Sequence, residues 1–164
     1  MIVVLPAGGA GYTAILSGKG SDPAVGLVEI YDLSQYSDSD LANISTRGSV
    51  STGEGAMIGG FIVGGGSGDG KVLVRGIGPS LKSQAITNAL PDPTLELHNV
   101  DGDVIASDDD WQDAQKDQIK ATGIPPTNPL EAAIVATLPP GNYTAVLRGK
   151  DQKSGVALVE IYHL

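Results

Sequence analysis

Cysteine is absent from this chain of 164 residues, which excludes a disulfide framework, a thiolate nucleophile and a cysteine-bound zinc site. Aromatic residues make up only 4% of the sequence, and there are two histidines. No apolar run approaches the roughly 18–20 residues of a membrane-spanning helix, so no membrane span is expected. The formal net charge of −9 disfavours nucleic acid as a partner and is compatible with cations.

Patterns that mark catalytic sites are also scarce. The sequence has no GxSxG motif, and His98 and His163 stand in strand-like segments without a recognisable partner. Residues 65–71 (GGSGDGK) approach a phosphate-binding loop, but Val72 stands where a serine or threonine would hold Mg²⁺. A strand-like segment then follows where that loop requires a helix. We therefore expect no enzymatic activity and no required cofactor.

Glycine and β-branched residues are abundant, with 23 glycines and 41% hydrophobic residues. Two-residue alternation predicts a series of short strands and one short helix at 111–121, with Asp110 as N-cap and Trp111 as anchor. This pattern predicts an all-β, antiparallel β-sandwich that is jelly-roll-like; a barrel is the alternative, and the strand order stays open. The expected strands are 2–5, 12–17, 25–33, 43–50, 56–63, 71–77, 94–99, 104–107, 132–138, 143–148 and 156–162.

Three segments between these strands have the composition of turns. Asp101 and Gly102 predict a tight hairpin of type I′, which needs positive φ at both central residues. Residues 64–70 are glycine-rich and predict a hairpin loop, and residues 138–142 (LPPGN) predict a turn.

The chain repeats part of itself. Residues 12–33 (YTAILSGKGSDPAVGLVEIYDL) align without gaps to residues 143–164 (YTAVLRGKDQKSGVALVEIYHL), and 13 of the 22 positions are identical. A repeat with an offset of 131 residues is the size of a domain. We therefore predict that 1–33 is the terminal hairpin of a preceding unit, 34–41 a linker and 42–164 one full unit.

An isolated hairpin is marginal in water, so residues 1–33 are expected to pack on something. They either fold back on the full unit of the same chain or add strands to a neighbouring molecule. The expected partners are therefore copies of the chain or neighbouring repeat units. A third interpretation is that the chain is one slice of a longer tandem protein.

The best candidate for a binding site is acidic. Carboxylates on irregular loops are the ligands that calcium prefers, and five aspartates fall within ten residues. The alternative is that these residues serve a turn, cap the helix or face solvent. The candidate calcium ligands are Asp101, Asp103, Asp108, Asp109 and Asp110.

Two further residue sets invite a hypothesis. Glu29 and Glu160 occupy matched strand positions, which favours a structural ion pair with Arg47, Arg75 or Arg148. Aromatic rings could stack on a polysaccharide, although tyrosines in strands are more often core residues. The rings concerned are Trp111, Tyr12, Tyr31, Tyr143 and Tyr162.

Several of these segments are similar to known protein families. ISTRG (44–48), IGGFIV (58–63) and VLVRGIGPSL (72–81), together with the LPPGNYTAVLRG ending, resemble a tandem repeat of large secreted or surface proteins of environmental bacteria. Residues 92–162, with TLELHNVDGDVIASDDD and PPGNYTA, also resemble the pre-peptidase C-terminal type of β-sandwich. The resemblance implies an extracellular or cell-surface location, and members of the second type accompany secreted enzymes and can bind calcium or polymeric substrates.

Taken together, these features favour a non-catalytic structural module that assembles by repeat stacking or strand donation into arrays or filaments. Two alternatives stay open. One is a calcium-dependent carbohydrate- or protein-binding module for adhesion, and the other is an accessory domain of a secreted hydrolase.

Overall fold

The computed structural model describes residues 2–6, 11–20, 24–33, 42–64 and 68–164. The chain divides into two compact units, Met1–Leu41 and Ala42–Leu164, which are treated separately below. The expected linker at 34–41 lies outside the described residues.

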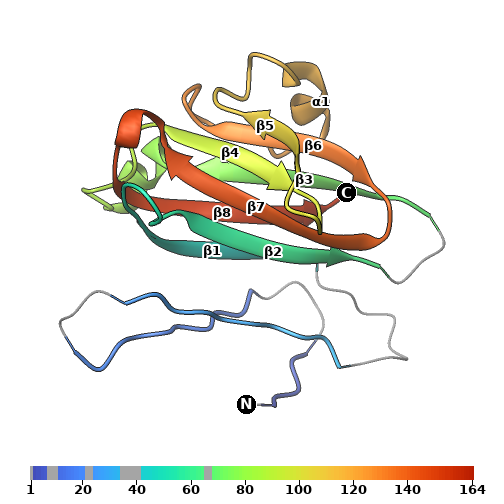
Figure 1. Cartoon of the computed structure of the whole chain (residues 1–164), viewed down its shortest axis with the longest axis horizontal. Helices are drawn as coiled ribbons and strands as arrows, with labels where there is room; N and C mark the ends of the chain where they lie inside the picture. Colours follow the sequence, from blue (N-terminus) through green and yellow to red (C-terminus); the bar gives the residue numbers. More distant parts are fainter. Residues whose placement is uncertain (1, 7–10, 21–23, 34–41, 65–67) are drawn as a thin grey trace. The chain divides into compact units, whose positions relative to one another are not determined.

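The unit Ala42–Leu164 is a sandwich of two antiparallel four-stranded sheets (Figure 1). One sheet has the order β1-β8-β3-β6 and the other β2-β7-β4-β5, which is the eight-strand double-sheet arrangement of a jelly roll. The predicted all-β sandwich is confirmed. The strands are β1 (Asn43–Val50), β2 (Met57–Val63), β3 (Gly70–Ile77), β4 (Pro93–His98), β5 (Val104–Asp108), β6 (Ala132–Leu138), β7 (Gly141–Gly149) and β8 (Gly155–His163).

The core lies between the inner faces of the two sheets. Alternate residues of β7 and β8 are buried there, in keeping with the two-residue period of a strand. β3 and β6 are instead apolar along most of their length because both of their faces are covered. Leu73 and Val135 point outward and pack against Trp111 and Ile119, which lie over the outer face of this sheet.

The helical region differs from its prediction. The helix α1 covers only Lys116–Ala121, its N-cap is Gln115 without a side-chain hydrogen bond, and Asp110 therefore does not cap it. Trp111 lies in the preceding turns and acts as the anchor, since it is 5% exposed and its indole N–H donates to the Asn128 carbonyl at 3.1 Å. Two 3₁₀ segments, Pro79–Gln84 and Lys150–Gln152, were not expected.

The connections between strands were predicted less well. The hairpin at Asp101 and Gly102 joins β4 to β5 as expected, but only Gly102 of the two has positive φ, so the turn is not type I′. The segment after β2 leads to β3 in the opposite sheet, so the hairpin predicted at 64–70 is wrong. β7 and β8 also belong to different sheets, so they form an arch across the sandwich and not a hairpin.

The unit Met1–Leu41 has no strand among its described residues, so the strands predicted at 2–5, 12–17 and 25–33 are wrong. Its two longer extended segments run side by side (Figure 1), with Leu16 against Gly26, where an added Cβ would lie 2.5 Å from Leu16 Cδ2. Strand structure needs a hydrogen-bonded neighbour, and two segments alone do not supply a stable sheet. In the described part of the chain, no helix is long and apolar enough to cross a membrane.

Candidate functional site

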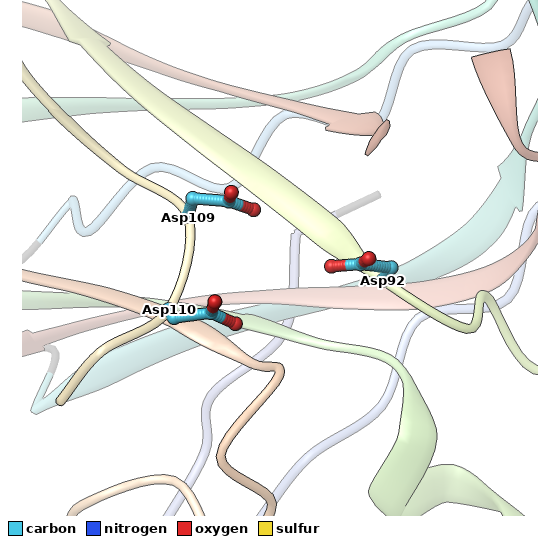
Figure 2. Close-up of side chains that lie close together, drawn as sticks. All are labelled: Asp92, Asp109 and Asp110. Atoms are coloured by element: carbon cyan, nitrogen blue, oxygen red, sulfur yellow. The ribbon is translucent and has the colours of Figure 1, made fainter. Parts of the chain in front are cut away.

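A cluster of three aspartates lies where β4 begins and β5 ends. The two strands are antiparallel, with Leu95 opposite Asp108, so the residue before β4 comes close to those that follow β5. Asp92, Asp109 and Asp110 each place a carboxylate oxygen within 4.8 Å of the others (Figure 2). These three aspartates are called the Asp92 cluster below.

The carboxylates of the Asp92 cluster are partly paired and partly unsatisfied. Asp92 is only 8% exposed, and Lys153 Nζ donates to its Oδ2 at 3.3 Å. Lys150 forms an ion pair with Asp109. One oxygen of each aspartate is nevertheless buried without a hydrogen-bond partner. Because buried polar groups are normally paired, the three unpaired oxygens make the Asp92 cluster the candidate cation site of the described residues.

The surroundings of these aspartates disfavour the charged form of two carboxylates. Burial raises the pKa of Asp110, and the neighbouring charge of Asp109 raises it further, against the opposing effect of Lys150. Burial also raises the pKa of Asp108, although the hydrogen bond from the Ala133 N–H lowers it. Such groups bind protons more tightly in the folded chain, so their contribution to stability is largest at acidic pH and is lost as pH rises through the folded pKa.

An open cavity of about 350 Å³ adjoins the Asp92 cluster. Its lining is dominated by carboxylates and has no basic side chain, which suits a hydrated cation or the ammonium group of a partner. The acidic residues that line it are Glu96, Asp108, Asp109, Asp110 and Asp113.

The structure separates the five aspartates that the sequence suggested as calcium ligands. Asp109 and Asp110 belong to the Asp92 cluster, whereas Asp108 Oδ2 accepts the Ala133 N–H at 2.8 Å. Asp101 and Asp103 are exposed at the opposite end of β5, where their backbone N–H groups donate to Asn99 Oδ1.

Asp92 is the member of the cluster that sequence reasoning missed. An aspartate before Pro93 carries no local mark of a ligand. Its place in the cluster follows only from the pairing of β4 with β5, which puts it beside residues that follow β5 in the chain.

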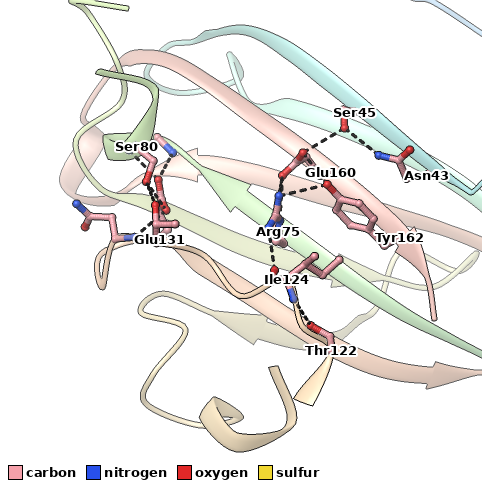
Figure 3. A network of polar contacts seen from close by, with 12 residues as sticks. Asn43, Ser45, Arg75, Ser80, Thr122, Ile124, Glu131, Glu160 and Tyr162 are labelled. Carbon is pink, nitrogen blue, oxygen red and sulfur yellow. Dashed lines mark hydrogen bonds and ion pairs between the residues drawn. The ribbon is translucent and has the colours of Figure 1, made fainter. Parts of the chain in front are cut away.

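A second polar group lies on the outer face of the other sheet. Glu160 of β8 stands between Ser45 of β1 and Arg75 of β3 in the strand register (Figure 3). Arg75 Nε donates to Glu160 Oε2 at 2.9 Å, and the Tyr162 hydroxyl donates to Glu160 Oε1 at 2.9 Å. Arg75 also donates to the Ile124 carbonyl at 2.8 Å. Of the three arginines considered, Arg75 is thus the partner of Glu160.

Glu131 is the most deeply buried carboxylate, with no exposed surface. Its Oε1 accepts the backbone N–H groups of Gly78 and Ser80, at 3.2 and 2.9 Å. Its Oε2 accepts the Ser80 hydroxyl at 2.9 Å and the Asn128 N–H at 3.2 Å (Figure 3). All its partners are structural, so Glu131 joins two loops and leaves no free oxygen for a ligand.

Of the remaining candidates, the rings of Tyr12 and Tyr31 are exposed. Trp111 and Tyr143 are buried, so their rings are not available to stack on a sugar. His98 lies between Glu96 Oε2 at 3.2 Å and the Gly102 carbonyl at 3.0 Å, and His163 is exposed at the end of β8.

Comparison with known protein families found no match, and comparison with curated proteins found none either. Among solved structures, the chain is similar to the pre-peptidase C-terminal domain of a collagenase from Bacillus anthracis. The two are 14% identical with a TM-score of 0.45, and the match covers 73% of this chain and 88% of the other. The assignment of the fold rests on the strand pairing described above.

Proposed function

We propose that this chain is a non-catalytic structural module in which residues 12–33 are the two closing strands of a neighbouring β-sandwich unit. The observation that carries the proposal is the contrast between matched positions. In β7 and β8, Leu147 and Val159 are fully buried. Their counterparts Leu16 and Val28 are 57% and 46% exposed. Within their own unit, the described residues of 12–33 thus present a core-forming sequence without a core.

Local contacts in residues 12–33 already match those of the closed unit. Tyr12 donates its hydroxyl proton to the Pro6 carbonyl at 2.9 Å, as Tyr143 does to Pro139. Tyr31 donates to Glu29 at 3.0 Å, as Tyr162 does to Glu160 at 2.9 Å. The segment therefore needs only the remaining strands of a sandwich in order to bury its apolar side chains.

Such a module would link β-sandwich units into an array on the cell surface or outside the cell. Burial of apolar side chains supplies the driving force, at about 25 cal/mol per Å² removed from water. No catalytic step is part of the proposal, because the titratable groups described above serve ion pairs, loops or the Asp92 cluster.

A chimeric chain tests whether residues 12–33 can close a unit. In this chain, residues 42–142 are followed directly by residues 12–33 in place of 143–164. We expect a cooperative thermal transition in circular dichroism, with a midpoint about 5–15 °C below that of the original chain. The decrease is expected because Gly26 replaces Ala157 in the core and Asp22 replaces Lys153 beside Asp92.

Two adjacent substitutions serve as matched controls in the chimera. Leu16→Asp places a charge at the buried position of Leu147 and is expected to abolish the transition. Ser17→Asp places the same charge at the exposed position of Arg148 and is expected to keep it. A chimera that stays unfolded would remove the basis of the proposed function.

Cation binding is a second candidate function, favoured by the three unpaired oxygens of the Asp92 cluster. A divalent cation there would offset the repulsion between the carboxylates of Asp109 and Asp110, which adds to burial in raising the pKa of Asp110. This candidate would make the module calcium-dependent, as in adhesion or in an accessory domain of a secreted hydrolase.

Calcium addition tests this candidate on the original chain. At 100 times the dissociation constant, a cation that binds only the folded state raises the free energy of unfolding by about 2.7 kcal/mol. We expect CaCl₂ to raise the thermal midpoint at pH 7 and to have less effect as the aspartates become protonated. Asp110→Asn should remove the calcium effect, whereas Asp101→Asn should retain it. An unchanged midpoint at millimolar calcium would count against a site.

A further inference from the structure

We infer that the acceptor of residues 12–33 is a β-sandwich body that lacks its own closing strands and carries an arginine at the position of Arg75. The inference rests on the proposed function and identifies its partner. Two features exclude a second copy of this chain as the acceptor: the number of closing strands and the charge at the Asp92 cluster. A third feature, the partner of Glu29, identifies the arginine.

The first feature is the ratio of closing strands to sandwich bodies. Each chain has one set of strands β1–β6 and two sequences able to close it, 12–33 and 143–164. If 12–33 entered a second copy, it would expel residues 143–164 of that copy and expose their core side chains. Exchange between copies therefore leaves one closing pair per chain unburied, whatever the number of copies. Net burial requires a body without a closing pair.

The second feature is the poorer fit of 12–33 to this body. Lys153 pairs with Asp92, whereas the matched residue of the partial copy is Asp22. An aspartate at that position would face a cluster that already contains three carboxylates. Ala157 is fully buried, and its counterpart Gly26 would leave its methyl volume empty. The chain's own strands are thus favoured over those of another copy.

The third feature is charge complementarity at Glu29. Its counterpart Glu160 is buried and bonded to Arg75 of β3 and Ser45 of β1. The partial copy keeps both Glu29 and Tyr31, and in the closed unit the cationic partner at this position is Arg75. A buried carboxylate without a cationic partner is strongly destabilising. The acceptor must therefore present an arginine on its strand equivalent to β3.

A fusion chain supplies such an acceptor. Leu5 aligns with Leu138, so a second copy of residues 42–137 is joined directly to residue 5 of the chain, which continues to Leu164. The fusion then holds two sandwich bodies and two closing pairs. We expect the backbone amides of residues 12–33 to exchange hydrogen at least about tenfold more slowly in the fusion than in the original chain. Residues 143–164 are the internal reference for a closed unit.

Variants of the fusion test the arginine. Glu29→Gln alone and Arg75→Gln in the added body alone should each accelerate exchange of residues 12–33. The double variant should exchange no faster than the Arg75→Gln variant, because the two residues act as one pair. Ser17→Ala is the control and should leave exchange unchanged. Equal protection in wild-type and Glu29→Gln fusions would overturn the assignment of the arginine.

The solution mass of the original chain separates the possible acceptors. Light scattering should give the monomer mass at all concentrations. A mass that grows with concentration, and returns to monomer with Leu16→Asp, would overturn the inference in favour of a second copy. Fusion amides at 12–33 that stay unprotected, while the chimera of residues 42–142 and 12–33 folds, would overturn the acceptor but leave the proposed function intact. If the chimera also failed to fold, both the acceptor and the proposed function would be overturned.

Discussion

Leu147→Ala is expected to lower the free energy of unfolding by about 3 kcal/mol, whereas Leu16→Ala should change it by less than about 0.5 kcal/mol. The two leucines occupy matched positions of the repeated sequence. Leu147 is fully buried between the sheets, so its removal leaves a cavity, while Leu16 is more than half exposed. Urea denaturation followed by Trp111 fluorescence measures the difference, because this single tryptophan is buried in the unit Ala42–Leu164.

The comparison includes its own control, because the substitution is the same at both positions and the flanking sequences are similar. Ala145 and its counterpart Ala14 provide a second pair for substitution by aspartate, with the large loss again expected only in β7. Equal destabilisation by Leu16→Ala and Leu147→Ala would mean that residues 12–33 already share a core in the isolated chain. The proposal of an external acceptor would then be wrong.

Glu131→Ala is expected to lower the free energy of unfolding by about 3–5 kcal/mol. The substitution leaves the N–H groups of Gly78, Ser80 and Asn128 without their acceptor in a buried region. It also releases the 3₁₀ segment Pro79–Gln84 from the loop that precedes β6. The same urea titration measures the effect.

Glu131→Gln is the conservative comparison for this prediction. Its amide retains one acceptor oxygen but directs a donor at groups that themselves donate, so we expect an intermediate loss of about 1–3 kcal/mol. Glu54→Ala, at an exposed glutamate, should change stability by less than about 0.5 kcal/mol. If Glu131→Ala lowered the free energy of unfolding no more than Glu54→Ala does, the hydrogen bonds of Glu131 would not contribute to stability.

The strands of the full unit could be predicted from the sequence because their signal is local. The alternation of polar and apolar residues placed β1 at its observed bounds, Asn43–Val50, and a continuous apolar run placed β6 at Ala132–Leu138. In β1 one face packs into the core, which imposes a period of two on its sequence, whereas both faces of β6 are covered, which makes its sequence apolar along most of its length.

The order of the strands was not predictable in the same way. β4 and β5 are hydrogen-bonded neighbours joined by a tight turn, and Asp101 with Gly102 marked that hairpin. The links from β2 to β3, from β6 to β7 and from β7 to β8 cross between sheets instead. A glycine- or proline-rich connection has the same composition whether it stays in one sheet or crosses to the other, so composition could not distinguish hairpins from arches.

The acidic site was also predictable only in part from the sequence. The run Asp108–Asp110 drew attention in the sequence, but Asp92 joined Asp109 and Asp110 only through the pairing of β4 with β5. The turn residues Asp101 and Asp103 were separated from them by the length of β5. Proximity along the chain was therefore a poor guide to which carboxylates meet.

The sequence by itself determined that the chain contains a repeat, that its full unit is built of short strands and that cysteine chemistry is absent. Only the tertiary structure decided that the two copies of the repeated segment differ. Residues 143–164 supply central strands of a closed sandwich, and the described residues of 12–33 form no strand. The physical reason is that β7 and β8 are stabilised by neighbours on both edges and by an opposing sheet, which the described residues of 12–33 lack within their own unit.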